Sequence, residues 1–153
     1  MPLAELNIAV PKFHLNDPRI ADFMHNLERV NRLATRLPGF IWRFPEEAEG
    51  HPDYEHPPWS AQIFTMSVWE RPEDLEHFVW NTLHKSFYDR KAEWFDVMES
   101  HHFVMWEVAE GHRPTLIEAK ERLDHLDTHG DTDFAFGWAY LPHVKLWQTQ
   151  QCG

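Results

Sequence analysis

Residues 62–95, QIFTMSVWERPEDLEHFVWNTLHKSFYDRKAEWF, hold the pattern that decides the fold. Up to Trp69, side chains alternate with the period of two that is typical of a strand. Beyond Arg71, apolar residues return at helical spacing, as Leu75, Phe78, Val79 and Leu83. The stretch therefore predicts a strand followed at once by one helix from Arg71 to Phe95.

The predicted helix carries a second stripe, made of His77, Trp80, His84 and Tyr88 at spacings of three, four and four. Imidazole, indole and phenol in line offer a base that titrates near neutral pH, a metal or haem ligand and a flat stacking surface. At about 100° per residue, this stripe points away from the centre of the apolar one, so it need not face the core. The sequence leaves open whether it faces a cleft, a dimer seam or solvent.

The first 110 residues add three strands and one helix to this unit. Strands are predicted at 3–10, 40–44 and 102–108, a helix between the Asn16-Asp17-Pro18 cap and the Pro38-Gly39 stop, and a loop at 45–60. The order β-α-β-β-α-β is that of the ferredoxin-like split βαβ fold, an α+β antiparallel sheet with both helices on one face. We expect the other face to need a cover, for which a second subunit is the simplest candidate.

Residues 111–153 form a C-terminal extension that we expect to pack on the same domain as residues 1–110. Pro114 opens a helix that ends at His129-Gly130. Aromatic residues then alternate with small ones from Phe134 to Tyr140, which predicts a fifth strand or an extended arm.

Composition excludes several classes of function. The net charge of −11 argues against nucleic-acid partners, because phosphate binding depends on Lys and Arg. No apolar run reaches about 18 residues, so no membrane span is expected. The single cysteine, Cys152, forms no intrachain disulfide and predicts a reducing, cytoplasmic location. Eight Trp and eleven Phe suit a flat hydrophobic ligand or a large subunit interface.

Five segments carry a resemblance to a known family. They are Leu3–Asn7, Pro38–Arg43, Thr65–Glu70, the helix with Trp80, His84 and Arg90–Phe95, and Gly111–Thr115. From about Pro2 to Trp138, the chain resembles an uncharacterised domain-of-unknown-function family of the dimeric α+β barrel superfamily, which is related to the antibiotic biosynthesis monooxygenases. The resemblance implies a homodimer with a cleft between sheet and helices in each subunit.

The activities of that superfamily are varied and set the alternatives. They include oxygenation of aromatic polyketides without a cofactor, haem degradation, and isomerisation or cyclisation of small molecules. The haem-degrading branch uses an Asn on the first strand and a Trp and a His on the second long helix. Asn7, Trp80 and His84 resemble that set, so the resemblance makes His84 the haem ligand if haem is bound.

The residues themselves nominate a site centred on His84 as general base, with Tyr88 and Asn7 as its catalytic partners. The substrate would contact Trp80, Trp106, Arg43 and Trp69. Each has an ordinary structural alternative: His84 on the helix surface, Tyr88 in packing, and Arg43 paired with acidic residues of the loop that follows it. The sets His51, Asp53, Glu55 and His56, and His125, Asp127, His129 and Asp131, lack the spacing of known metal loops, and we assign no metal.

The sequence thus favours a cytoplasmic, homodimeric small-molecule enzyme of the antibiotic-biosynthesis-monooxygenase type, with a hydrophobic or aromatic substrate and no required cofactor. Its chemistry is expected to be monooxygenase-like or cyclase/isomerase-like. The alternatives are a haem-binding or haem-dependent protein and a non-catalytic dimeric binding module.

Overall fold

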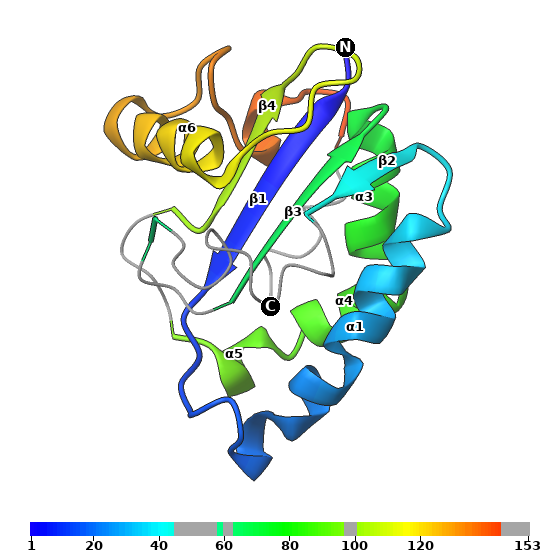
Figure 1. Cartoon of the computed structure of the whole chain (residues 1–153), viewed down its shortest axis with the longest axis vertical. Helices are drawn as coiled ribbons and strands as arrows, with labels where there is room; N and C mark the ends of the chain where they lie inside the picture. Colours follow the sequence, from blue (N-terminus) through cyan, green and yellow to red (C-terminus); the bar gives the residue numbers. More distant parts are fainter. Residues whose placement is uncertain (45–57, 60–62, 97–100, 145–153) are drawn as a thin grey trace.

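The computed structural model describes residues 1–44, 58–59, 63–96 and 101–144. Its strands are β1 (Leu3–Ala9), β2 (Phe40–Arg43), β3 (Ile63–Trp69) and β4 (Phe103–Glu107). Its α-helices are α1 (Ala21–Thr35), α3 (Pro72–Asn81), α4 (Leu83–Tyr88), α5 (Lys91–Trp94) and α6 (Leu116–His129). Short 3-10 helices, η1 (Pro18–Ile20) and η3 (Trp138–Tyr140), complete the described elements, and the fold is α+β (Figure 1).

The four strands form one antiparallel sheet in the order β2-β3-β1-β4. β1 is central, with Leu3 opposite Trp69 on one side and Glu107 on the other. All four strands predicted from the sequence are confirmed, with each end within one residue of its predicted position. β2 is an edge strand whose pairing with β3 shifts at a bulge between Phe40 and Trp42.

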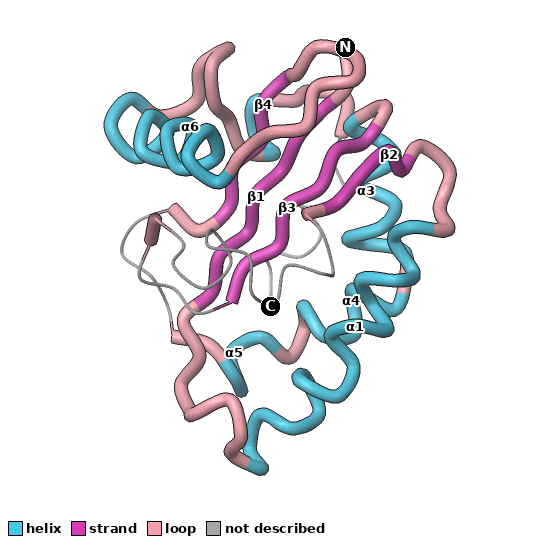
Figure 2. The backbone as a smooth tube through the Cα atoms, viewed as in Figure 1, coloured by secondary structure: helices cyan, strands magenta, loops and turns pink. Residues whose placement is uncertain are grey.

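The single helix predicted from Arg71 to Phe95 is wrong, because the chain forms three short helices there (Figure 2). The first break is at Thr82, whose backbone is extended at φ −126° and ψ −172°. The Thr82 hydroxyl donates to the carbonyl oxygen of Phe78 and accepts from the backbone N–H of His84. One side chain therefore ends α3 and caps α4, a competition with helix continuation that apolar spacing does not reveal.

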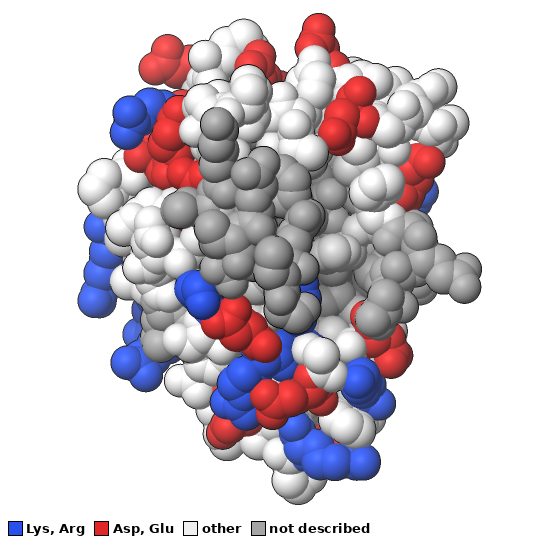
Figure 3. All heavy atoms as spheres, turned by 180° about the vertical axis from the view of Figure 1, so that it is seen from behind, with Lys and Arg blue, Asp and Glu red and all other residues white. Residues whose placement is uncertain are grey.

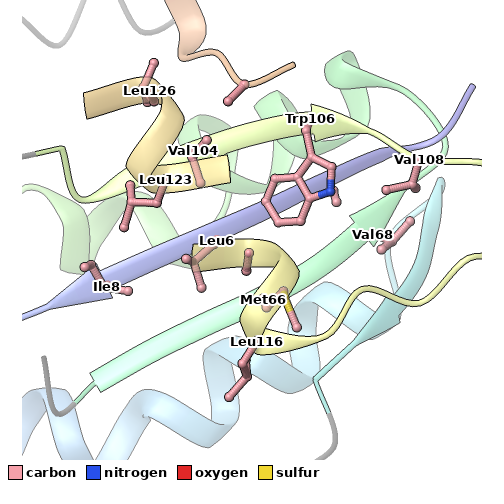
Figure 4. Close-up of a cluster of buried hydrophobic side chains, with 13 residues drawn as sticks. Leu6, Ile8, Met66, Val68, Val104, Trp106, Val108, Leu116, Leu123 and Leu126 are labelled. Atoms are coloured by element: carbon pink, nitrogen blue, oxygen red, sulfur yellow. The ribbon is translucent and has the colours of Figure 1, made fainter. Parts of the chain in front are cut away.

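Helices cover both faces of the sheet. α1, α3 and α4 lie on one side, and we call the side chains between them and the sheet the helix-side layer (Figure 1). α6 packs on the opposite face, where Leu116, Leu123 and Leu126 meet β1 and β4 residues such as Leu6 and Trp106 (Figure 4). The cover expected for this face is supplied, over β1 and β4, by α6 of the same chain.

The segment from Phe134 to Tyr140 is an arm rather than a regular strand. Phe136 and Met105 exchange two backbone hydrogen bonds of 2.8 and 2.9 Å, which is one isolated bridge at the free edge of β4. The chain then turns into η3, and His143 reaches Glu73 of α3 at 3.1 Å. The arm thus joins the sheet edge to α3. Among the helices described, none combines the length and apolar character that crossing a membrane requires.

Charged side chains of both signs mix at the end of the molecule where α1 begins and α5 lies (Figure 3). Arg90 links the two elements there, with ion pairs to Asp22 at 3.2 Å and to Glu93 at 2.8 Å. Its guanidinium also lies 4.6 Å from the centre of the Trp94 ring. These contacts fix the end of the helical stretch that began at Pro72.

Candidate functional site

The structure brings most of the predicted site residues together in the helix-side layer. Residues of β1 with odd numbers face this layer, because Leu3 packs there and strand side chains alternate. By the register of the sheet and the packing of the helices, the predicted residues on this side are Asn7, Arg43, Trp69, Trp80, His84 and Tyr88. Trp106 lies on the opposite face, where its indole N–H donates to Glu118 of α6 at 2.9 Å.

His84 is held at the start of α4 by its backbone and by its ring. Its Nδ1 lies 3.2 Å from the carbonyl oxygen of Val79, and its ring centre is 4.9 Å from that of Phe78 and 6.5 Å from that of Tyr88. Because a carbonyl only accepts, Nδ1 carries the proton and Nε2 keeps a lone pair. Burial lowers the pKa of His84, opposed by the hydrogen bond to Val79, so the neutral ring dominates at pH 7.

An aromatic series crosses the helix-side layer from the β2 edge to the β4 edge. Successive ring contacts, with centres 4.8 to 6.5 Å apart, join Phe40, Trp69, Phe78, His84, Tyr88, Trp80, Trp138 and Phe103. Trp80 is only 5% exposed, and its indole N–H has no hydrogen-bond partner among the described residues. A buried N–H without a partner is costly, and a ligand oxygen placed beside it would satisfy it.

A buried carboxyl group outside the set of predicted site residues also lies in this layer. Glu5 on β1 is 6% exposed, and its Oε1 accepts a hydrogen bond of 2.6 Å from the hydroxyl of Ser67 on β3. Ser67 in turn accepts from the indole N–H of Trp69 at 2.9 Å. Burial raises the pKa of Glu5 to about 8, with the hydrogen bonds from Ser67 opposing the shift. Glu5 is therefore largely uncharged at neutral pH.

The sequence held one signal for Glu5. The alternation in residues 3–10 places Glu5 and Asn7 on the face opposite Leu6 and Ile8, and Leu3, which shares the face of Glu5, is 1% exposed. Apolar residues on both strands that pair with β1 mark this face as covered: Met105 lies directly opposite Glu5, and Trp69 lies opposite Leu3. A strand at the centre of a sheet with helices on both sides buries both of its faces.

Arg43 and Asp74 are the other charged groups of the layer. Arg43 pairs in register with Ser67, and burial lowers its pKa while the charge of Glu28 on α1 opposes that shift. The loop expected to supply acidic partners, residues 45–57, lies outside the described residues. Asp74, 8% exposed, forms an ion pair of 3.0 Å with Arg71 and packs directly on Gly39, whose φ is +84°.

The remaining histidines do not gather into a metal centre in the part of the chain that the structure describes. His77 is exposed on α3. Of the C-terminal set, Asp127 accepts from His101 and Asp131 accepts from the backbone of Gly137, so neither points to a shared cation. The set from His51 to His56 lies outside the described residues.

A shallow pocket of about 500 Å³ lies away from these groups, between the end of β4 and the start of α6. Its lining includes His112 and Glu118, which form a hydrogen bond of 2.7 Å, together with Glu121 and Arg122. None of the predicted site residues lines it.

Fold and site together define an α+β protein with a four-stranded antiparallel sheet, whose ionisable and aromatic groups meet between the sheet and one layer of helices. The chain belongs to the family described as Domain of unknown function (DUF3291), whose model matches residues 2–152. No curated protein and no solved structure matches the chain.

Proposed function

We propose that this protein is an enzyme for a hydrophobic, aromatic small molecule, with His84 as the general base. The observation that carries the proposal is the contact between His84 Nδ1 and the carbonyl oxygen of Val79, which leaves Nε2 free to take a proton. A lowered pKa supports the same role, because a base must be neutral at its working pH.

The neighbours of His84 fit an aromatic substrate. The rings of Trp80 and Tyr88, 4.8 Å apart and almost perpendicular, offer one face and one edge for stacking. The unpartnered indole N–H of Trp80 and the half-buried amide of Asn7 are donors for a substrate oxygen. Arg43 and Trp69, in the same layer, belong to the substrate-binding wall of this proposal.

The proposed architecture is the ferredoxin-like fold of the dimeric α+β barrel superfamily, to which the antibiotic biosynthesis monooxygenases belong. The strand order β2-β3-β1-β4 and the element order of residues 3–107 support it. We further propose a homodimer in a reducing, cytoplasmic compartment. Support for the dimer comes from aromatic side chains on the β2–β3 half of the α6-side face, Trp42, Phe44 and Phe64, which are only half buried.

Haem is the second candidate ligand, favoured by the same Nε2 lone pair. Neutral imidazoles whose other nitrogen donates to a carbonyl are common metal ligands, so the donor fits. In this alternative His84 would ligate the iron, and the aromatic rings of Trp80 and Tyr88 would flank the macrocycle.

Replacing His84 tests both candidates against a matched control. His84→Ala should abolish turnover of hydroxylated naphthalenes and anthracenes, followed by mass spectrometry, whereas His77→Ala, an exposed histidine of the preceding helix, should keep it. Hemin titration of the same proteins separates the alternatives, because a haem protein shows a shifted Soret band that His84→Ala removes. Equal turnover in both variants, with folded far-UV spectra, would contradict the role of His84.

A further inference from the structure

The shallow pocket between the end of β4 and the start of α6 has no part in the mechanism above. Its volume of about 500 Å³ is in the range of small-molecule sites. Two of its polar residues satisfy each other, because the ring Nε2 of His112 donates to Glu118 at 2.7 Å. The second oxygen of Glu118 accepts from the indole N–H of Trp106, which packs between the sheet and α6 (Figure 4). The Glu118 carboxylate is therefore engaged at both oxygens.

Arg122 is a cation of this pocket that has no carboxylate partner among the described residues. Glu118 lies four residues earlier, a spacing at which Glu and Arg commonly pair on a helix, but its oxygens are engaged with His112 and Trp106. The Arg122 guanidinium instead lies 3.8 Å from the centre of the Phe134 ring and donates from Nη1 to the Phe134 carbonyl oxygen at 2.8 Å. A guanidinium held in this way is preorganised to bind a carboxylate.

Two carboxylates and one apolar side chain complete the lining that a ligand would meet. Glu121, next to Arg122 on α6, and Glu107, at the end of β4, form no side-chain ion pair or hydrogen bond within the described residues. Ile117 is 71% exposed, although isoleucine is usually buried. A carboxylate attracts an ammonium group, and an exposed apolar side chain gains when an apolar group covers it. The pocket thus offers partners for three different groups of one small molecule.

We propose that this pocket binds a free α-amino acid with an aliphatic side chain. Arg122 binds the carboxylate of the ligand, Glu107 and Glu121 bind its ammonium group, and the aliphatic side chain covers Ile117. A ligand with a single charge fits less well, because an anion would meet two carboxylates and a cation would meet the guanidinium. The inference goes beyond the proposed function and does not depend on it, since neither His84 nor any other predicted site residue lines the pocket.

Three probes with one carbon skeleton test which groups the pocket recognises. L-leucine carries both charges, 4-methylpentanoate lacks the ammonium group, and 3-methylbutylamine lacks the carboxylate. In ¹⁵N NMR titrations of the wild type at pH 7, leucine should shift the amides of residues 107–122 and bind about tenfold more tightly than either other probe. Equal affinity for leucine and one of the truncated probes, or no binding of leucine at millimolar concentration, overturns the proposal.

Arg122→Gln tests the contact with the carboxylate. It should weaken leucine binding about tenfold and should not weaken the binding of 3-methylbutylamine, which has no carboxylate. Lys120→Gln removes the same charge from the same helix, where Lys120 pairs with Asp124, and should bind leucine as the wild type does. Unchanged leucine affinity in a folded Arg122→Gln protein overturns the role of Arg122.

The double variant Glu107→Gln/Glu121→Gln tests the ammonium contacts at two exposed positions, so it also decides the question if Arg122→Gln does not fold. It should weaken the binding of leucine and 3-methylbutylamine but not that of 4-methylpentanoate. Glu70→Gln/Asp96→Asn, which removes two exposed charges elsewhere, should leave all three affinities unchanged. Equal leucine affinity in the two double variants overturns the proposal.

The proposed function is judged separately. His84→Ala should bind leucine as the wild type does, because His84 does not line the pocket. Loss of leucine binding in a folded His84→Ala protein would assign the amino acid to the helix-side layer and overturn the inference, whereas turnover of the hydroxylated naphthalenes still decides whether His84 is a base.

Discussion

At the scale of single residues, Glu5 shows that an alternating pattern locates a strand without saying whether each of its faces is covered. The alternation around Leu6 and Ile8 located the strand, but it could not tell a solvated face from one covered by helices. Periodicity reports which side chains share a face, whereas burial depends on elements that arrive later in the chain. Residue type and spacing nominated His84 and Tyr88 as candidates, whereas the burial of Glu5 became visible only in the packed structure.

Glu5 should also make stability depend on pH in a defined direction. Its pKa is about 8 in the folded chain against 4.5 as the ordinary value, so the uncharged form favours folding. The stability is fully present below pH 4.5 and is lost as the pH rises toward 8. Glu5→Gln should therefore match the wild type at pH 4.5 and exceed it by a few kcal/mol (~3) at pH 8.5 in urea unfolding.

Glu107→Gln is the control for that comparison, because its carboxyl is exposed on the neighbouring strand. An equal gain in both variants would assign the effect to net charge and not to burial of Glu5. A constant difference between Glu5→Gln and the wild type from pH 4.5 to 8.5 would contradict the buried titration.

At the scale of elements, the division of residues 72–94 into three helices decides where the histidines point. The angle between the two stripes assumed one continuous axis, and Thr82 ends that axis. His84 thereby enters ring contact with Phe78, while His77 stays on the exposed side of α3. Apolar spacing correctly predicted helical structure for this stretch. It did not predict the break, because a threonine such as Thr82 is compatible both with a helix interior and with an N-cap.

Thr82→Ala tests this element. It removes the cap of α4 and should lower the free energy of unfolding by about 1 kcal/mol, measured by urea unfolding, with Thr82→Ser close to the wild type. Thr128→Ala is the matched control, since Thr128 makes the same bond to a carbonyl four residues earlier but caps no helix. An equal loss in the two alanine variants would contradict a capping role.

At the scale of the whole molecule, the sheet has one face closed by α1, α3 and α4 and another on which α6 lies over β1 and β4. The element order and the antiparallel sheet followed from residues 1–110, because hydrophobic period and turn residues are local signals. The packing of α6 on the sheet could not be predicted in the same way. The apolar period of residues 116–129 identifies the buried side of the helix but not the surface on which that side packs.

Sedimentation velocity in the analytical ultracentrifuge tests the proposed homodimer. At micromolar concentration the wild type should sediment as a dimer, and Trp42→Glu should sediment as a monomer, because a charge on the half-buried β2–β3 surface opposes its burial. Ile117→Glu, on a side chain that is 71% exposed on α6, should remain a dimer. A wild-type monomer at every concentration would contradict the proposal.

The contact between Gly39 and Asp74 links two connections that are distant in sequence. Gly39 has a positive φ, and any Cβ at that position would overlap the Asp74 carboxylate. The backbone N–H of Glu70 also donates to the Gly39 carbonyl at 2.7 Å. A side chain at position 39 therefore requires a smaller residue at position 74. In natural variants of this chain, we expect substitutions at positions 39 and 74 to occur together.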